Sequence, residues 1–299
     1  MHVIAKIELN EIIFNLKRVP FRVKSAVLFG SSARGTQVKD SDVDILVVSD
    51  EIPPQRHRRY REISFIKNII NINPPLDVML LTSNECISNF RNHNPLFLDI
   101  AFEGQVLIDE GNFLRELIDE TKKYILDRGI EKTEDGWKFP VPYRSEASFS
   151  KVSNRQFADA MLYDARRDYE IGVFILEKGY FDKAVFHFQQ SVEKSLKAVM
   201  IMMGIFVKSH FVGKALIKEI EEKKFPDSWK NELRRMAQMS TEIEPEVTWS
   251  RYPGIDNSNL WIPAEEYSLE DAEITKEKCR KILITSQEFY YWWFKEKQP

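Results

Sequence analysis

The sequence predicts a mixed α and β domain in the first half of the chain and an all-helical bundle in the second half. Two observations support this prediction. Up to about residue 128, short β-branched runs alternate with helical patterns, whereas beyond about residue 150 apolar residues recur at the three- and four-residue intervals of helices. The chain has 299 residues, of which 43% are hydrophobic, so it is long enough for two domains.

The first half begins with a strand, a tight turn and a second strand. Residues 25–29 read SAVLF and residues 43–48 read VDILVV, and a glycine-bounded turn, GSSARG, follows the first of these runs. A helical pattern over residues 55–70 precedes a third strand, LDVMLL, at residues 76–81. An amphipathic helix over residues 114–127 closes this α+β domain, which we expect to contain a mixed sheet with helices.

A segment with little apolar periodicity separates the two halves. Residues 129–150 contain Gly136, Pro140, Pro142 and several charges. Glycine and proline interrupt regular structure, so we expect a linker here. The predicted domains are therefore residues 1–128 and residues 151–299.

The second half shows the period of helices throughout. One apolar stripe defines a core helix and consists of Phe181, Ala184, Val185, Phe188, Val192, Leu196, Val199 and Met203. A preceding helix over residues 154–178 ends at Gly179, a residue that suits the left-handed end of a helix. Further helices are expected over residues 208–223, 226–240 and 269–295, which together predict a helical bundle.

Composition excludes several broad classes of function. The formal net charge of -3 gives the chain no general attraction to nucleic acid or to an anionic membrane. No apolar stretch approaches the roughly 20 residues that cross a bilayer, and the first residues do not resemble a signal peptide. The two cysteines, Cys86 and Cys279, form neither a metal-ligand pair nor a disulfide framework, so we expect a cytoplasmic protein.

Two carboxylates at the start of the second strand carry the strongest chemical signal. Asp42 and Asp44 are two residues apart, so their side chains share one face of the strand. Close carboxylates repel each other unless a cation lies between them, and oxygen ligands suit Mg²⁺ or Mn²⁺. Before them, Gly30 permits close approach of the backbone, and Ser31 and Ser32 offer amides and hydroxyls for phosphate oxygens. The alternative without a functional site is that GSSARG forms a hairpin turn and that these aspartates are ordinary surface charges.

The turn GSSARG followed by SDVDILV resembles the minimal branch of the polymerase-beta-like nucleotidyltransferases. The resemblance covers roughly the first 110 residues and implies a third carboxylate on a neighbouring strand, for which LDVMLL offers Asp77. It implies that Asp42, Asp44 and Asp77 bind metal ions and catalyse transfer of a nucleoside monophosphate from an NTP, in the first place ATP, to a hydroxyl acceptor on protein or RNA. Arg34 and Ser41 join Gly30, Ser31 and Ser32 as the expected nucleotide-binding residues.

The second half resembles the HEPN family of up-and-down helical bundles. The resemblance rests on residues 162–204, on KSHFVGKALI at 208–217 and on SRYPG at 250–254. It implies a homodimer, and it implies that this domain commonly accompanies a minimal nucleotidyltransferase. Lys197, His210 and Arg251 are the candidates for binding a nucleotide or another polyanion, although each also has an ordinary structural interpretation.

The ribonuclease motif of that family, Arg-x4-6-His, is absent here. The three positions at the required distance before His187 hold Tyr180, Phe181 and Asp182, and none of the corresponding positions before His210 holds an arginine. We therefore do not expect ribonuclease activity of that type. His187 itself is more simply a histidine at the boundary of the core.

Two interpretations of the whole chain stay open at this point, and a third, toxin-antitoxin chemistry within one chain, is weakened because the toxin motif is absent. One is a cytoplasmic nucleotidyltransferase with a helical domain for dimerisation or for binding the acceptor. The other is a nucleotide-binding regulatory or antitoxin-like module that performs no transfer. The basic run RHRRYR at residues 56–61 fits a solvated helix face better than a contact with the acceptor.

Overall fold

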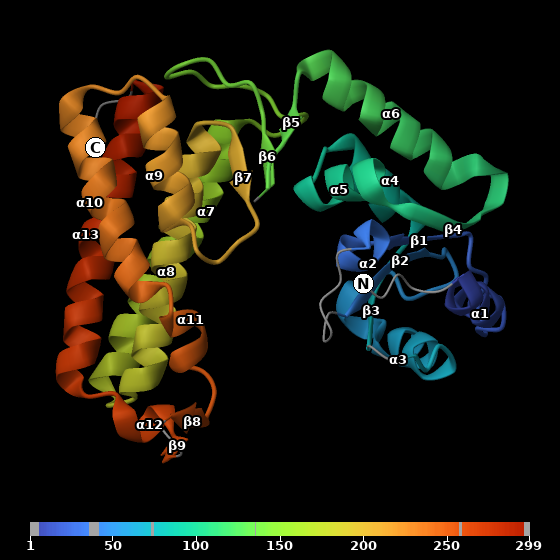
Figure 1. Cartoon of the computed structure of the whole chain (residues 1–299), viewed down its shortest axis with the longest axis horizontal. Helices are drawn as coiled ribbons and strands as arrows, with labels where there is room; N and C mark the ends of the chain where they lie inside the picture. The colour runs from blue at the N-terminus through green and yellow to red at the C-terminus, as the bar shows by residue number, and fades with distance from the viewer. Residues whose placement is uncertain (1–5, 36–41, 73–74, 135, 257–258, 296–299) are drawn as a thin grey trace. The chain divides into compact units, whose positions relative to one another are not determined.

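The computed structural model describes residues 6–35, 42–72, 75–134, 136–256 and 259–295. The chain divides into two compact units, Met1–Gly129 and Ile130–Pro299 (Figure 1). Each unit has its own core, and each is described by itself below.

The first unit is built on a mixed sheet of four strands. These strands are β1 (Ser25–Phe29), β2 (Val43–Val48), β3 (Leu76–Leu81) and β4 (Gln105–Asp109), in the spatial order β3-β2-β1-β4. β1 pairs antiparallel with both β2 and β4, whereas β2 and β3 are parallel. Parallel neighbours need a crossover, which α3 (Tyr60–Ile69) provides. The predicted mixed sheet with helices is confirmed.

Helices cover both faces of this sheet (Figure 1). The remaining helical segments are α1 (Lys6–Leu16), α2 (Gly30–Arg34), η1 (Arg56–Arg58), α4 (Ser83–Arg91), α5 (Pro95–Glu103), η2 (Glu110–Asn112) and α6 (Phe113–Arg128). Successive strand residues face opposite sides, so Leu28 packs in the apolar cluster of α1 and α3. Val27 packs in the cluster of α4, α5 and α6. The strands are therefore apolar on both faces, which explains their continuous hydrophobic runs.

Long helices form the second unit. Its helices are α7 (Asn154–Glu177), α8 (Phe181–Met202), α9 (Gly213–Glu222), α10 (Asp227–Ile243), α11 (Glu246–Trp249), α12 (Pro263–Glu266) and α13 (Leu269–Phe294). α7 and α8 form the predicted helical hairpin, and α13 packs against both. Gly179 lies in the turn between them with a φ of 81°, a left-handed conformation that glycine adopts without strain. The predicted helical bundle is confirmed.

The segment predicted as a linker differs from that expectation. Part of it forms β5 (Glu131–Lys132) and β6 (Gly136–Lys138), which join β7 (Ile205–Val207) in a small antiparallel sheet. Trp137, Phe139 and Phe149 are buried there. Burial of three aromatic rings favours a defined structure over a flexible connection, so these residues belong to the second unit.

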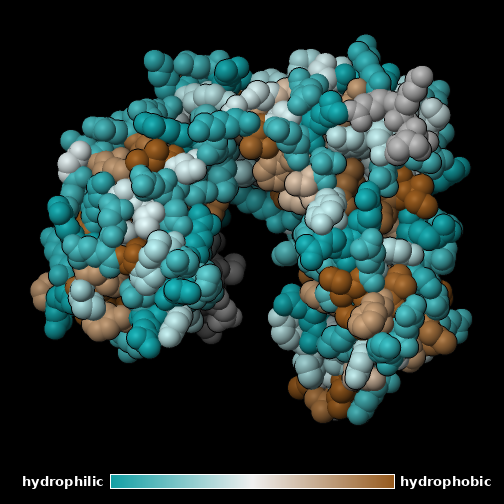
Figure 2. Space-filling model, turned by 180° about the vertical axis from the view of Figure 1, so that it is seen from behind, coloured by the Kyte–Doolittle hydropathy of each residue, from teal (hydrophilic) through white to brown (hydrophobic). Residues whose placement is uncertain are grey.

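A short hairpin of β8 (Gly254–Asp256) and β9 (Asn259–Trp261) lies near α12. Its Ile255 and Leu260 are largely exposed, and Figure 2 shows apolar residues at this end of the second unit. None of the helices in the described ranges is both long and apolar enough to cross a membrane.

Candidate functional site

Two of the predicted carboxylates lie side by side at the start of the parallel strand pair. Asp44 on β2 is the direct partner of Asp77 on β3 in the strand register. Paired residues of neighbouring strands point to the same face of a sheet. Asp42 immediately precedes β2 and shares this face with Asp44 by the alternation of side chains. The structure thus places all three aspartates at one edge of one face.

The face that carries the aspartates is the one covered by α4, α5 and α6. Alternation along β2 puts Asp44 on the same side as Leu46 and Val48, which belong to the apolar cluster of those helices. The apolar part of the strand is therefore buried beneath these helices, while its first residues lie at the end of the sheet, where they are more exposed. Asp44 is half-buried, and Asp42 and Asp77 are exposed.

Gly30 provides the space that the Asp44 carboxylate occupies. Its φ is 74°, and a Cβ atom at this position would lie 2.2 Å from Oδ2 of Asp44. Any side chain here would combine backbone strain with a collision. The glycine predicted for close approach to a phosphate thus also allows close approach of a carboxylate.

The two serines of the turn differ in their surroundings. Ser32 is buried, and its hydroxyl donates a hydrogen bond to the backbone oxygen of Asp42 at 3.3 Å. This contact fixes the chain just before β2, so Ser32 positions Asp42 in addition to its predicted place in the nucleotide site. Ser31 is half-buried beside it. Ser41, also predicted to bind nucleotide, lies outside the described residues.

The three carboxylates influence one another electrostatically. Burial raises the pKa of Asp44, and the negative charges of Asp77 and Asp42 raise it further, while the nearby Arg34 lowers it. Arg34 itself forms an ion pair with Glu103 of α5 at 2.8 Å. The site therefore holds an excess of negative charge that an added cation would relieve.

Asp77 has a cationic neighbour from the crossover helix. Nζ of Lys67 on α3 lies 3.4 Å from Oδ1 of Asp77, and the backbone N–H of Val78 donates to the same oxygen at 3.0 Å. Among the residues that the structure describes, no three histidine, cysteine or acidic side chains converge closely enough to hold a metal ion. The aspartates nevertheless offer only hard oxygen donors, the ligand type that Mg²⁺ and Mn²⁺ prefer.

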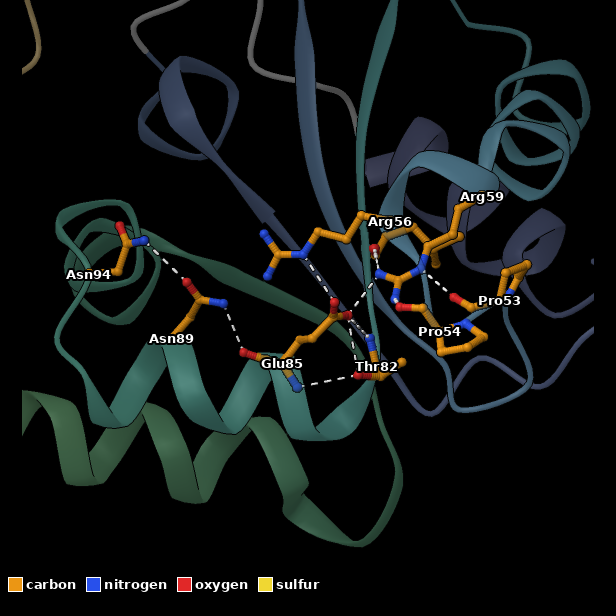
Figure 3. A network of polar contacts seen from close by, with 9 residues as sticks. Pro53, Pro54, Arg56, Arg59, Thr82, Glu85, Asn89 and Asn94 are labelled. Carbon is orange, nitrogen blue, oxygen red and sulfur yellow. Dashed lines mark hydrogen bonds and ion pairs between the residues drawn. The ribbon is translucent and has the colours of Figure 1, made fainter. Parts of the chain in front are cut away.

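The basic run at residues 56–61 contains a structural residue that the sequence did not reveal. Arg59 is 1% exposed, and its guanidinium donates to the backbone oxygens of Pro53, Pro54 and Leu80 (Figure 3). It also pairs with Glu85 at 2.7 Å. Arg59 therefore connects the loop after β2 to the end of β3 and holds the two strands that carry the aspartates.

In the second unit, two of the three predicted ligand-binding residues share one partner. The buried carboxylate of Glu193 accepts from Nζ of Lys197 at 2.8 Å and lies 2.9 Å from Nδ1 of His210. Because Glu193 offsets the charge of Lys197 and occupies Nδ1 of His210, this pair is a weaker anion site than the sequence suggested.

Arg251 does not join that pair. Its guanidinium lies over the rings of Phe186 and Tyr252, with 5.2 Å and 4.9 Å to their centroids. Phe186 precedes Lys197 by eleven residues of α8, which corresponds to about 16 Å along a helix. The three predicted residues therefore lie in two separate places.

His187 belongs to a network of charged side chains that connects two helices. Its Nδ1 lies 3.4 Å from Asp168 of α7, which also accepts from Lys194 at 2.5 Å. Burial acts to raise the pKa of Asp168, but the hydrogen bonds from His187 and Lys194 outweigh it and leave that pKa below its usual value. This arrangement joins α7 to α8.

Two family models match the chain, one in each unit. The model described as a nucleotidyltransferase domain matches residues 9–106. The model described as a HEPN domain matches residues 158–297. The first match includes Asp42, Asp44 and Asp77, and the second spans α7 to the end of α13 apart from the first residues of α7.

Curated relatives come from the archaeon Methanocaldococcus jannaschii. One, named "Putative toxin MJ1304", is 33% identical over 46% of this chain and 90% of its own length. Another, named "Putative protein adenylyltransferase MJ1305", is 35% identical over 34% of this chain and 69% of its own length. Among solved structures, an archaeal HEPN homologue is 24% identical and covers 44% of this chain and 97% of its own, with a TM-score of 0.34.

Proposed function

We propose that this chain, which belongs to the nucleotidyltransferase domain family through its first unit and to the HEPN domain family through its second, transfers a nucleoside monophosphate to a hydroxyl acceptor. The donor is an NTP, in the first place ATP, and the acceptor is a hydroxyl group on protein or RNA. The observation that carries this proposal is the pairing of Asp44 with Asp77 across β2 and β3, with Asp42 two residues before Asp44.

The chemistry follows from the charges in the reaction. The acceptor oxygen forms a bond with the α-phosphorus of the NTP, the bond from that phosphorus to the bridging oxygen breaks, and pyrophosphate leaves. Asp77 is exposed and has room to receive the proton of the acceptor hydroxyl. Gly30 and Ser31 line the turn beside Asp44 and provide the backbone surface against which the phosphates lie.

Asp42, Asp44 and Asp77 would hold a divalent ion, Mg²⁺ or Mn²⁺. When bound, such an ion neutralises phosphate charge as it develops in the reaction. Burial is the largest cause of the raised pKa of Asp44, and the charges of Asp77 and Asp42 raise it further; a divalent ion would relieve this repulsion between carboxylates. The ammonium of Lys67 lies 3.4 Å from Oδ1 of Asp77 and offsets part of the charge of that carboxylate.

For the second unit we propose dimerisation or binding of the acceptor or nucleotide, without ribonuclease activity. No arginine precedes His187 or His210 at the spacing of the family's ribonuclease motif, and both histidines face carboxylates. The relative named as a protein adenylyltransferase favours a protein as the acceptor. The relative named as a toxin favours a regulatory, toxin-antitoxin-like setting.

The test is an intact-mass screen for transfer. The purified protein is incubated with Mg²⁺, each of the four NTPs in turn, and either protein extract or cellular RNA. We expect one acceptor to gain the mass of a nucleoside monophosphate, with release of pyrophosphate. The double variant Asp42→Asn, Asp44→Asn should lose at least about a thousandfold in rate, because two of the carboxylates that would hold the divalent ion are gone.

A charge-matched variant controls for the change in net charge. Asp119→Asn with Asp127→Asn removes two exposed carboxylates from α6, away from the strand pair, and should transfer at the normal rate. If the natural sequence binds NTP but forms no product, the chain is instead a nucleotide-binding regulatory or antitoxin-like module. Transfer that survives in the double variant would refute the assigned carboxylates.

A further inference from the structure

The second unit contains an open pocket that is separate from the histidines and lysines considered above. Its volume is about 650 Å³, and it is lined by Tyr143, Phe225, Trp293, Lys223 and Lys224 together with two aliphatic residues. This volume falls in the range of small-molecule sites, roughly 300–1,000 Å³. Three segments meet here, namely the chain after β6, the connection from α9 to α10, and the last turn of α13.

The walls of this pocket are aromatic and held in place. Tyr143 stands 5.7 Å from Trp293 and 6.4 Å from Phe225, measured between ring centroids. The neighbouring Arg144 fixes Tyr143, because its guanidinium donates to the backbone oxygen of Trp292 and lies 4.4 Å from the centroid of that ring. Tyr143 is 52% exposed although it stands beside this packed cluster. A planar ring can therefore stack against it.

The charged side chains that line the pocket are cations. Lys223 and Lys224 line it, and among the described residues no carboxylate does. Lys223 is half-buried, and its nearest carboxylate, on Glu219, lies 3.9 Å away and is shared with Lys138 at 3.2 Å. Burial lowers the pKa of the Lys223 ammonium, because the nearby carboxylates do not fully offset the loss of its hydration.

The indole of Trp293 adds an unsatisfied donor. Trp293 is 1% exposed, and within the described part of the chain its Nε1 has no hydrogen-bond partner. A buried donor without an acceptor is unfavourable by about 1–3 kcal/mol. Trp293 is itself a lining residue, so a ligand in the pocket lies close to this indole.

We propose that this pocket binds an aromatic anion, meaning a planar ring that carries a phosphate or carboxylate group. The ring lies against Tyr143 and Phe225, and the anionic group faces Lys223 and Lys224. Stacking on an aromatic side chain and a charge-assisted contact with lysine are the interactions that such a ligand provides. The site does not depend on the proposed transfer reaction, which uses the other unit.

Titration calorimetry on the full chain tests this proposal without involving the first unit. The protein carries Asp42→Asn and Asp44→Asn, and the buffer contains EDTA. The probes are AMP and indole-3-acetate, which are aromatic anions, together with adenosine and inorganic phosphate, which each have half of the required chemistry. We expect saturable binding of at least one anion, and binding of adenosine and phosphate that is about tenfold weaker or more.

Matched variants locate the binding site. Tyr143→Ala and Lys224→Glu change exposed pocket residues and should each weaken binding by about tenfold. Tyr180→Ala and Lys218→Glu change exposed residues of the same types outside the pocket and should leave binding unchanged. In the spectrum of the ¹⁵N-labelled protein, the indole N–H signal of Trp293, one of six tryptophans, should shift as the ligand binds.

The outcomes separate the two sources of the ligand. Preference for AMP identifies a nucleotide, free or at the end of an RNA strand, and a short oligoadenylate then separates those two cases. Preference for indole-3-acetate identifies an aromatic carboxylate. The proposal is wrong if neither anion binds, if adenosine binds as tightly as AMP, or if the control variants weaken binding as much as the pocket variants do.

Discussion

Three separate features of the chain position the Asp44 carboxylate. The register of β2 with β3 sets Asp77 beside it, Ser32 fixes the residue two positions earlier, and Gly30 leaves the space that its Oδ2 fills. The three features come from residues at different sequence separations from Asp44. Together they keep several negative charges close to one another, which is electrostatically unfavourable. Such an arrangement is typical of a functional site, where stability is lost in exchange for reactivity.

We expect Gly30→Ala to reduce both stability and transfer. Alanine at a φ of 74° is strained by about 1–2 kcal/mol, and its Cβ would displace the Asp44 carboxylate. Urea unfolding measures the first effect, and the intact-mass assay should show transfer that is at least about tenfold slower.

Gly111→Ala separates these two effects. Gly111 has a φ of 64°, and a Cβ there meets no atom within 4 Å, so this variant has the backbone strain without the collision. It should lose similar stability and transfer normally. Equal transfer by the two variants would show that the position of Asp44 is unimportant.

Sequence reasoning at this scale succeeded where the signal was local. The spacing of Asp42 and Asp44 on a predicted strand places them on one face without any knowledge of the fold. The contacts of Ser32 and Arg34 could not be predicted in this way. Their partners, the backbone oxygen of Asp42 and the carboxylate of Glu103, depend on how separate segments of the chain meet. Arg59 stands in a run of arginines, and nothing in that run distinguishes a buried guanidinium from exposed ones.

At the scale of elements, the connection from β2 to β3 keeps the two strands that carry the aspartates in place. Arg59 satisfies backbone oxygens at both ends of this connection, and Glu85 at the start of α4 compensates its charge. Burial acts to raise the pKa of Glu85, but hydrogen bonds from Arg59, the Thr82 N–H and Arg56 lower it to about 2.

The pH dependence of stability follows from that pKa. The carboxylate of Glu85 is stabilised in the folded state, so its contribution is present above its ordinary pKa of 4.5 and is lost as the pH falls towards about 2. The contribution amounts to at most about 3 kcal/mol. Chemical unfolding of the natural protein should show this loss between pH 5 and about 2, whereas Glu85→Gln should lack it.

At neutral pH, Glu85→Gln should destabilise the protein by about 2–4 kcal/mol, because it leaves the buried Arg59 charge without its carboxylate. Glu110→Gln breaks the exposed ion pair with Arg22 and is the matched control, with an expected effect below about 0.5 kcal/mol. A neutral-pH effect of Glu85→Gln no larger than that of the control would contradict the structural role of Arg59.

The elements that the sequence predicted well are those with a long or repeated pattern. Strands β1, β2 and β3 and helices α7, α8 and α13 have continuous periodic runs. β5 and β6 have two and three residues, and β6 pairs with β7, which begins 67 residues after the end of β6. A strand that short has no period to detect. The glycine and prolines of residues 129–150 are therefore the strongest local signal, and they indicate a linker.

At the scale of the whole molecule, the chain consists of two units that each have their own core. The boundary at Gly129 matters because the residues just after it complete the second unit. Trp137, Phe139 and Phe149 are each less than 6% exposed. They are part of the core that a bundle beginning at α7 would lack.

Fragments of the second unit test this division. We expect residues 130–299 to fold and to unfold cooperatively in a thermal scan followed by circular dichroism. Residues 151–299 should be less stable by at least about 3 kcal/mol, because loss of a single large buried aromatic residue has an effect of that size. Equal melting temperatures for the two fragments would show that residues 130–150 are a linker after all.

The register of β2 and β3 also bears on how faithfully the protein folds. A slip of one residue between these parallel strands would turn Asp77 to the opposite side of the sheet and leave Asp44 without its neighbour. The same slip would turn Val78 and Leu80 away from the apolar cluster that they share with α1 and α3. Misaligned molecules would therefore lack the carboxylate pair and lose apolar packing around β3, so the packing of the core and the pairing of the two aspartates depend on the same register.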